Sequence, residues 1–137
     1  MAIPASRDLV LRKNADYKES MVFTSNGSAI DFTGWTFKMM IRMGPLLTDT
    51  SVLTVSTVGG PTVEGIYLSD PTNGTIDIWV KSSSLTSLTP NPIYTADQYQ
   101  QVMYSYYYYD LQATNTITGE KIVYVEGHIQ LYDGSTS

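Results

Sequence analysis

The last third of the chain holds two stretches of alternating apolar and polar side chains, residues 104–114 and 121–131, joined by a short polar turn around Thr118 and Gly119. A repeat of two residues matches a β-strand, whose successive side chains point to opposite faces, and does not fit a helix. The side chains that share a face are Tyr107, Tyr109, Leu111 and Ala113 on the first stretch, and Val123, Val125, Gly127, Ile129 and Leu131 on the second. The two stretches therefore predict a long β-hairpin.

The remaining sequence predicts further short strands separated by turn residues. We expect them at residues 8–12, 17–25, 35–43, 52–57, 63–68 and 75–81. No stretch has sustained apolar residues at helical spacing, and residues 83–88 suffice for one helical turn. About seven to nine short strands predict an all-β fold. We expect a two-layer antiparallel β-sandwich, immunoglobulin-like or similar.

The length of 137 residues is ordinary for one domain with a single core, so residues 1–137 are expected to form one β-sandwich domain. The core is predicted from the inward positions of the clearest strands. Its expected members are Trp35, Phe37, Met39, Ile41, Ile76, Ile78, Tyr109, Leu111, Val123, Val125 and Ile129.

Charge and cysteine content exclude several classes of function. The net charge of -5, with no basic run longer than Arg12 and Lys13, disfavours a nucleic-acid partner. The absence of cysteine excludes disulfides, thiolate nucleophiles and cysteine-ligated metal sites. No apolar run reaches the roughly 18 residues of a membrane span, and no signal-peptide pattern begins the chain. We therefore expect a protein synthesised in a cytoplasm, with no membrane partner.

The residues that catalysis usually requires are sparse. His128 is the only histidine, and alternation places it on an outward face. The carboxylates are scattered without the spacing of a calcium loop, and no nucleophile-elbow or phosphate-loop pattern is present. We therefore predict no enzyme, with no catalytic residue, no cofactor and no metal.

One segment, residues 82–105, interrupts the regular series of strands. This long excursion contains a single charged residue, Asp97, together with Pro90, Pro92 and several Gln and Tyr residues. Two interpretations remain open, a surface excursion packed on the sandwich and a contact loop for a partner, since interfaces favour Tyr and Met over charge. The expected contact residues are Ile93, Tyr94, Tyr99, Gln100, Gln101 and Met103.

A set of local motifs also recurs in a fixed order. Asp31, Thr33 and Gly34 form a corner before a strand that ends in Ile41 and Arg42. The motifs that follow are residues 74–78, a Tyr-Asp-Leu strand at 107–112, a glycine turn at 119–121, and a Glu-Gly pair within 126–129. In this order the chain resembles, over residues 8–133, the small β-sandwich domains of tailed-bacteriophage virions. Such domains occur at the N-termini of upper baseplate proteins and tail fibres, and as stand-alone virion proteins.

The motif residues also have physical roles that can be stated without the family. Asp31 and Thr33 can hydrogen-bond the backbone of a bend, and Gly34 supplies a positive φ. Asp110 faces away from its neighbours in the core, so we expect it to meet a cation such as Arg42 or a backbone corner. The residues assigned a structural role are Asp31, Thr33, Gly34, Tyr109, Asp110, Leu111 and Gly127.

The resemblance implies a non-enzymatic virion structural protein, made in the bacterial host cytoplasm, that binds other phage virion proteins. A symmetric homo-oligomer in the particle is expected. Its position, in the tail, baseplate, neck or capsid surface, stays open. One alternative is a carbohydrate- or receptor-binding module that uses the Tyr-rich loop in host adhesion, because exposed aromatics beside Asp and Gln are common in sugar sites. A non-viral scaffold or adhesion domain is a third possibility.

Overall fold

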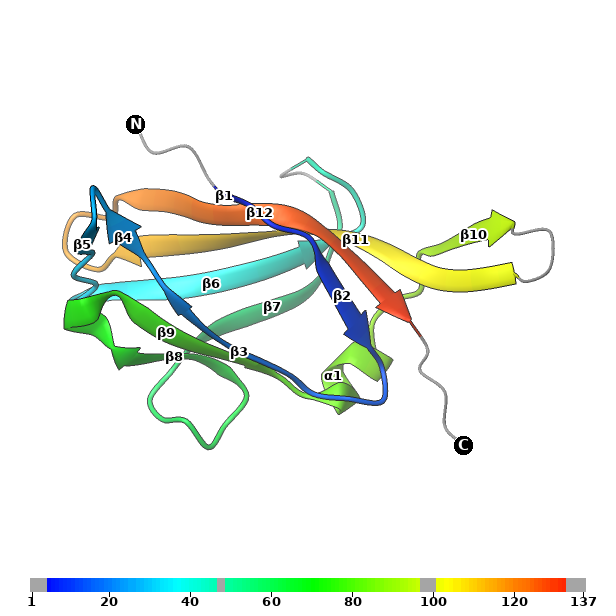
Figure 1. Cartoon of the computed structure of the whole chain (residues 1–137), viewed down its shortest axis with the longest axis horizontal. Helices are drawn as coiled ribbons and strands as arrows, with labels where there is room; N and C mark the ends of the chain where they lie inside the picture. Colours follow the sequence, from blue (N-terminus) through cyan, green and yellow to red (C-terminus); the bar gives the residue numbers. More distant parts are fainter. Residues whose placement is uncertain (1–4, 47–48, 97–100, 133–137) are drawn as a thin grey trace.

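The computed structural model describes residues 5–46, 49–96 and 101–132, and within them it confirms an all-β fold (Figure 1). The described strands are β1 (Ala5–Ser6), β2 (Leu9–Arg12), β3 (Tyr17–Val22), β4 (Thr24–Ser25), β5 (Ser28–Ala29), β6 (Trp35–Arg42), β7 (Ser51–Val58), β8 (Gly65–Asp70), β9 (Thr75–Val80), β10 (Pro92–Ala96), β11 (Gln101–Asn115) and β12 (Lys121–Tyr132). The helical elements in the same residues are η1 (Pro71–Asn73) and α1 (Ser82–Thr86). No helix in the described ranges is long and apolar enough to cross a membrane.

Ten of these strands form one curled sheet, in the hydrogen-bonded order β1-β12-β11-β6-β7-β8-β9-β3, with β2 also on β12 and β10 also on β11. The sheet is mixed, because β1 and β2 run parallel to β12, and β7 runs parallel to β8. Strand β7 joins the half of the sheet that contains β6, β11 and β12 to the half that contains β8, β9 and β3. It pairs with β6 over residues 51–56 and with β8 at 57–58. The structure thus shows one curled mixed sheet where two antiparallel sheets were expected. Alternation reports the buried face of a strand, but not the identity or direction of its neighbours.

The interior of the curled sheet holds the core. Nine of the eleven expected core residues are buried, namely Phe37, Met39, Ile41, Ile76, Ile78, Tyr109, Leu111, Val125 and Ile129. Trp35 and Val123 are only partly buried. Val123 is displaced by a bulge, because the β11–β12 register passes from Val125 opposite Leu111 to Val123 opposite Gln112. The extra residue, Tyr124, packs against the core instead.

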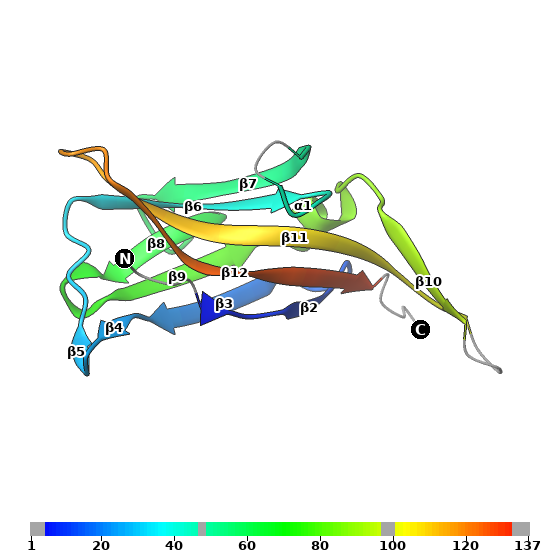
Figure 2. The same ribbon diagram turned by 90° about the horizontal axis from the view of Figure 1, so that it is seen from above.

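The excursion at 82–105 has regular structure in its described residues. Its first part packs on the core through the buried side chains of Leu85 and Leu88, which belong to α1 and the turn after it. Its second part is an antiparallel hairpin in which Pro92 to Ala96 of β10 pair with Ser105 to Gln101 of β11. We call this hairpin the arm, and it extends beyond the rest of the sheet (Figures 1 and 2). The buried Leu85 and Leu88 agree with the packed interpretation for the first part of the excursion, and a partner contact for the arm stays a prediction.

Candidate interaction surface

A row of aromatic rings runs along the outer face of β11 and β12. Alternation sends Tyr107, Tyr109 and Leu111 into the core, so the intervening residues of β11 face outward. The outward rings, which we call the aromatic strip, belong to Tyr104, Tyr106, Tyr108, His128 and Tyr132, and all are partly exposed. Neighbouring rings lie 4.9–6.3 Å apart between centroids. Offset and edge-to-face contacts of this kind are favourable, so the rings form a continuous ordered surface.

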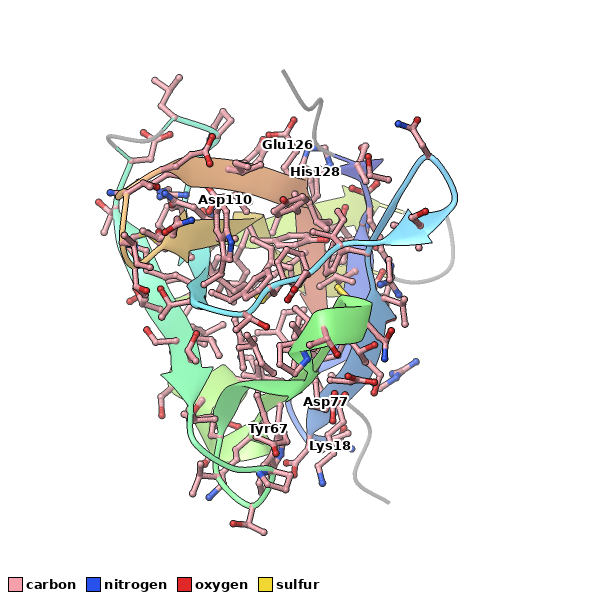
Figure 3. The ribbon with its side chains drawn as sticks, turned by 90° about the vertical axis from the view of Figure 1, so that its left-hand side faces the viewer. Lys18, Tyr67, Asp77, Asp110, Glu126 and His128 are labelled. Carbon is pink, nitrogen blue, oxygen red and sulfur yellow. The ribbon has the colours of Figure 1, made fainter. Side chains whose placement is uncertain are left out.

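One end of the strip opens into a hollow of about 280 Å³. The pairing of β11 with β12 and with β6 brings these residues together. Tyr108 lies opposite both His128 and Arg42, while Asp110 lies opposite both Glu126 and Met40. The residues that line the hollow are Ser6, Arg42, Gly44, Pro45, Tyr108, Tyr109, Asp110, Glu126, Gly127 and His128. Figure 3 labels Asp110, Glu126 and His128 in this half of the molecule.

A buried ion pair forms part of the lining. Arg42 Nη1 donates to Asp110 Oδ2 at 2.7 Å, which confirms the expected pairing of these residues. Both residues are buried, with side chains 9% and 12% exposed, although they lie on the outer face of the sheet. Within the described residues, Arg42 Nε and Asp110 Oδ1 have no hydrogen-bond partner. The pair is therefore only partly satisfied, and its two charges depend strongly on each other.

The N-terminal segment borders the strip on the other side of β12. The backbone N–H of His128 donates to Asp8 Oδ1 at 3.0 Å, and His128 Nδ1 lies 3.5 Å from the same oxygen. The His128 side chain is 44% exposed, so its ring is accessible beside Tyr106 and Tyr108. The outward position expected for this histidine is confirmed, and its neighbours make it part of a surface.

The corner at Asp31, Thr33 and Gly34 has the geometry expected from the sequence. The backbone N–H of Thr33 donates to Asp31 Oδ1 at 2.9 Å, and Gly34 adopts a φ of 81°. Hydrogen bonds from Thr33 hold the pKa of Asp31 below its usual value. The Gly34 carbonyl accepts from Thr116 N at 3.0 Å and from Thr116 Oγ1 at 2.7 Å. The corner is thereby attached to the turn between β11 and β12.

The later motif residues hold the N-terminal segment against β12. The hydroxyl of Tyr109 donates to the carbonyl oxygen of Arg7 at 2.6 Å, and burial raises the pKa of Tyr109 to about 12. A Cβ at Gly127 would overlap that same carbonyl, so only glycine allows this close approach. Leu111 fills the core with 1% of its surface exposed. These residues position the strands beneath the strip.

The predicted contact residues fall on the arm or outside the described residues. Ile93 and Tyr94 lie in β10, where they pair with Tyr104 and Met103 of β11. Gln101 begins β11, opposite Ala96. Tyr99 and Gln100 lie outside the described residues. The arm thus meets the aromatic strip at Tyr104, which lies in β11 next to Met103 and opposite Ile93.

A second hollow, of about 270 Å³, lies on the outside of the other half of the sheet. Its lining includes Trp79 and Tyr67 beside Asp77, which accepts a hydrogen bond from Ser20 Oγ at 2.6 Å. The ammonium of Lys18 lies 4.3 Å from the centroid of the Trp79 ring. Figure 3 shows Lys18, Tyr67 and Asp77 far from Asp110, Glu126 and His128, across the interior.

No group of three or more potential metal-ligating side chains occurs among the residues that the structure describes. No known family model matches the chain, and comparison with curated proteins found no match. The assignment of function therefore depends on the motif resemblance and on the geometry of these surfaces.

Proposed function

We propose that the chain is a non-enzymatic structural protein of tailed-bacteriophage virions, which binds other virion proteins in the particle. The observation that carries this proposal is the arm, an antiparallel hairpin that extends beyond the sheet. The strand segments of the arm, 92–96 and 101–105, contain no charged residue in a chain of net charge -5. Within the described residues β10 pairs only with β11, so its other edge offers backbone groups to a further strand.

The aromatic strip supports the same proposal. Tyrosine is enriched at protein interfaces because its ring gives a large contact area at small entropic cost. The strip continues from the base of the arm onto β12, so one partner can contact both. In a symmetric ring or lattice, the same surfaces would recur on each copy. The virion position of the chain is left open among tail, baseplate, neck and capsid surface.

The pairing of β10 with β11 defines the position at which the arm can be removed. Ile93 and Tyr104 lie directly opposite each other, so a two-residue Asn-Gly turn can join them in place of residues 94–103. We expect this variant to keep the melting temperature of the wild type within a few degrees, because the arm extends beyond the rest of the sheet (Figure 2). Incorporation into particles, measured by the protein content of purified virions, is expected to be lost.

Ile117→Asn provides the control for the arm deletion. Ile117 is 89% exposed in the turn between β11 and β12, at the opposite end of the sheet (Figure 1). This variant removes an exposed apolar side chain away from the arm, and it is expected to be incorporated normally. Normal incorporation of a folded protein without the arm would overturn the proposal that the arm makes the assembly contact.

The hollow around Trp79 favours a second candidate function, a carbohydrate- or receptor-binding module. Sugar rings stack on aromatic faces while their hydroxyls bond to side chains such as those of Asp77 and Ser20, both of which line this hollow. In a glycan array, this function requires saturable binding that Trp79→Ala abolishes, whereas Tyr106→Ser leaves it intact. Binding to no glycan, or equal binding by both variants, would contradict a sugar site at Trp79.

A further inference from the structure

Two carboxylates face each other on the outer surface of β11 and β12. Asp110 and Glu126 are direct cross-strand partners, an arrangement that is unfavourable when both groups are ionised. Asp110 is paired with Arg42, but in the described part of the chain no hydrogen bond or ion pair involves the Glu126 side chain. Glu126 is also exposed. The described residues therefore place a negative charge beside the 280 Å³ hollow, and none of them supplies a cation for it.

The other groups around the hollow are those that favour a cation. The partly exposed rings of Tyr108 and His128 contact each other at 4.9 Å between centroids, and the face of a tyrosine ring attracts positive charge. Asp8 adds a further carboxylate next to His128, 3.5 Å from its Nδ1 atom. Arg42, the one arginine or lysine among the described lining residues, is already bound to Asp110. The surroundings thus carry an excess of negative charge and aromatic surface.

The geometry favours an organic cation over a metal ion. A hard divalent metal needs six or more oxygen ligands or retained waters, and no group of three ligating side chains occurs in the described residues. A guanidinium needs less from the protein, because its planar fork binds a single carboxylate and its flat face stacks on an aromatic ring. Glu126 and Tyr108 supply these two features from neighbouring strands.

We propose that this hollow receives an arginine side chain of a neighbouring virion protein, with Glu126 as its carboxylate partner and Tyr108 as its aromatic neighbour. The inference rests on the proposed function for the identity of the neighbour. The cation site itself is a property of this chain. A bound guanidinium would explain why Asp110 and Glu126 lie opposite each other, since it neutralises Glu126 while Arg42 neutralises Asp110.

The test uses the isolated protein and two peptides that differ in charge. Acetyl-Gly-Arg-Gly-amide is titrated into the isotope-labelled chain and followed by NMR, with the citrulline peptide as the uncharged isostere. The arginine peptide is expected to shift the amide resonances of Tyr108, Glu126 and His128 saturably, and the citrulline peptide is not. Glu126→Gln is expected to weaken arginine binding about fivefold, the effect of one exposed ion pair.

Glu120→Gln is the matched control, because it removes the same charge from an exposed residue next to β12. Its arginine affinity is expected to equal that of the wild type. Equal shifts with the citrulline peptide, or equal weakening by Glu120→Gln, would overturn the site. Normal incorporation of Glu126→Gln into particles would overturn the proposal that the bound arginine belongs to a neighbouring virion protein. Because the arm deletion tests the proposed function separately, failure of one idea is distinguishable from failure of the other.

Discussion

Replacing Asp110 with alanine is expected to lower the free energy of unfolding by about 3–5 kcal/mol, the usual result of breaking a buried ion pair. Arg42 is only 7% exposed, and Asp110 Oδ2 accepts its Nη1 at 2.7 Å. Without the carboxylate, the guanidinium would remain buried with its Nε already lacking a described partner. The loss therefore comes mainly from an uncompensated charge.

Urea denaturation of the wild type and of Asp110→Ala measures this effect. Glu120→Ala is the control, since an exposed turn residue is expected to change stability by less than about 0.5 kcal/mol. The double variant Arg42→Met with Asp110→Leu is expected to recover most of the loss, because an apolar pair of similar size needs no charge compensation. A cost for Asp110→Ala below about 1 kcal/mol would show that the pair is well hydrated.

The sequence predicted that Asp110 meets a cation such as Arg42 or a backbone corner, and the structure shows the first of these two partners. Alternation in 35–43 and in 104–114 placed the two residues on the outward faces of their strands, and β6 and β11 pair in the register that joins them. The corner at Asp31 was predictable for a similar reason, since its hydrogen bond spans only two residues. Local periodicity and local turn chemistry both leave a direct signal in a single sequence.

Contacts between distant segments left no such signal. The parallel pairing of β1 and β2 with β12 joins the two ends of the described chain, and the bend at β7 depends on two different neighbours. The bulge that turns Tyr124 toward the core also depends on its partner strand. The arm was predicted only as an excursion, because its Gln- and Tyr-rich sequence does not alternate between apolar and polar residues.

The aromatic strip, in contrast, was present in the sequence but missed. The alternation that directs Tyr107 and Tyr109 into the core also directs Tyr106 and Tyr108 outward, and the pairing of β11 with β12 then places His128 opposite Tyr108. A row of outward aromatic residues on two adjacent strands can therefore be predicted when the outward positions of each strand are considered together with the inward ones. The polar face carries the candidate contact surface.

Phe32 was absent from the predicted core because it lies in the corner between two strands, where alternation gives no information. It is nonetheless fully buried, with ring centroids 4.8 Å from Phe37, 5.5 Å from Tyr124 and 5.7 Å from Phe23. The turn made by Asp31 directs this ring inward, so a motif residue on the surface and a core residue depend on each other. Such a position joins the corner to the interior of the sheet.

Phe32→Ala is accordingly expected to lower the free energy of unfolding by about 3–5 kcal/mol, since it removes a buried ring and leaves a cavity among three others. Phe32→Leu keeps most of the apolar volume and is expected to lose clearly less in the same urea denaturation experiment. Asp31→Ala tests the coupling, because loss of the turn bond should weaken the packing of Phe32. In the double variant with Phe32→Ala, the cost of Asp31→Ala is expected to shrink. Strictly additive effects would show that the corner and the aromatic cluster are independent.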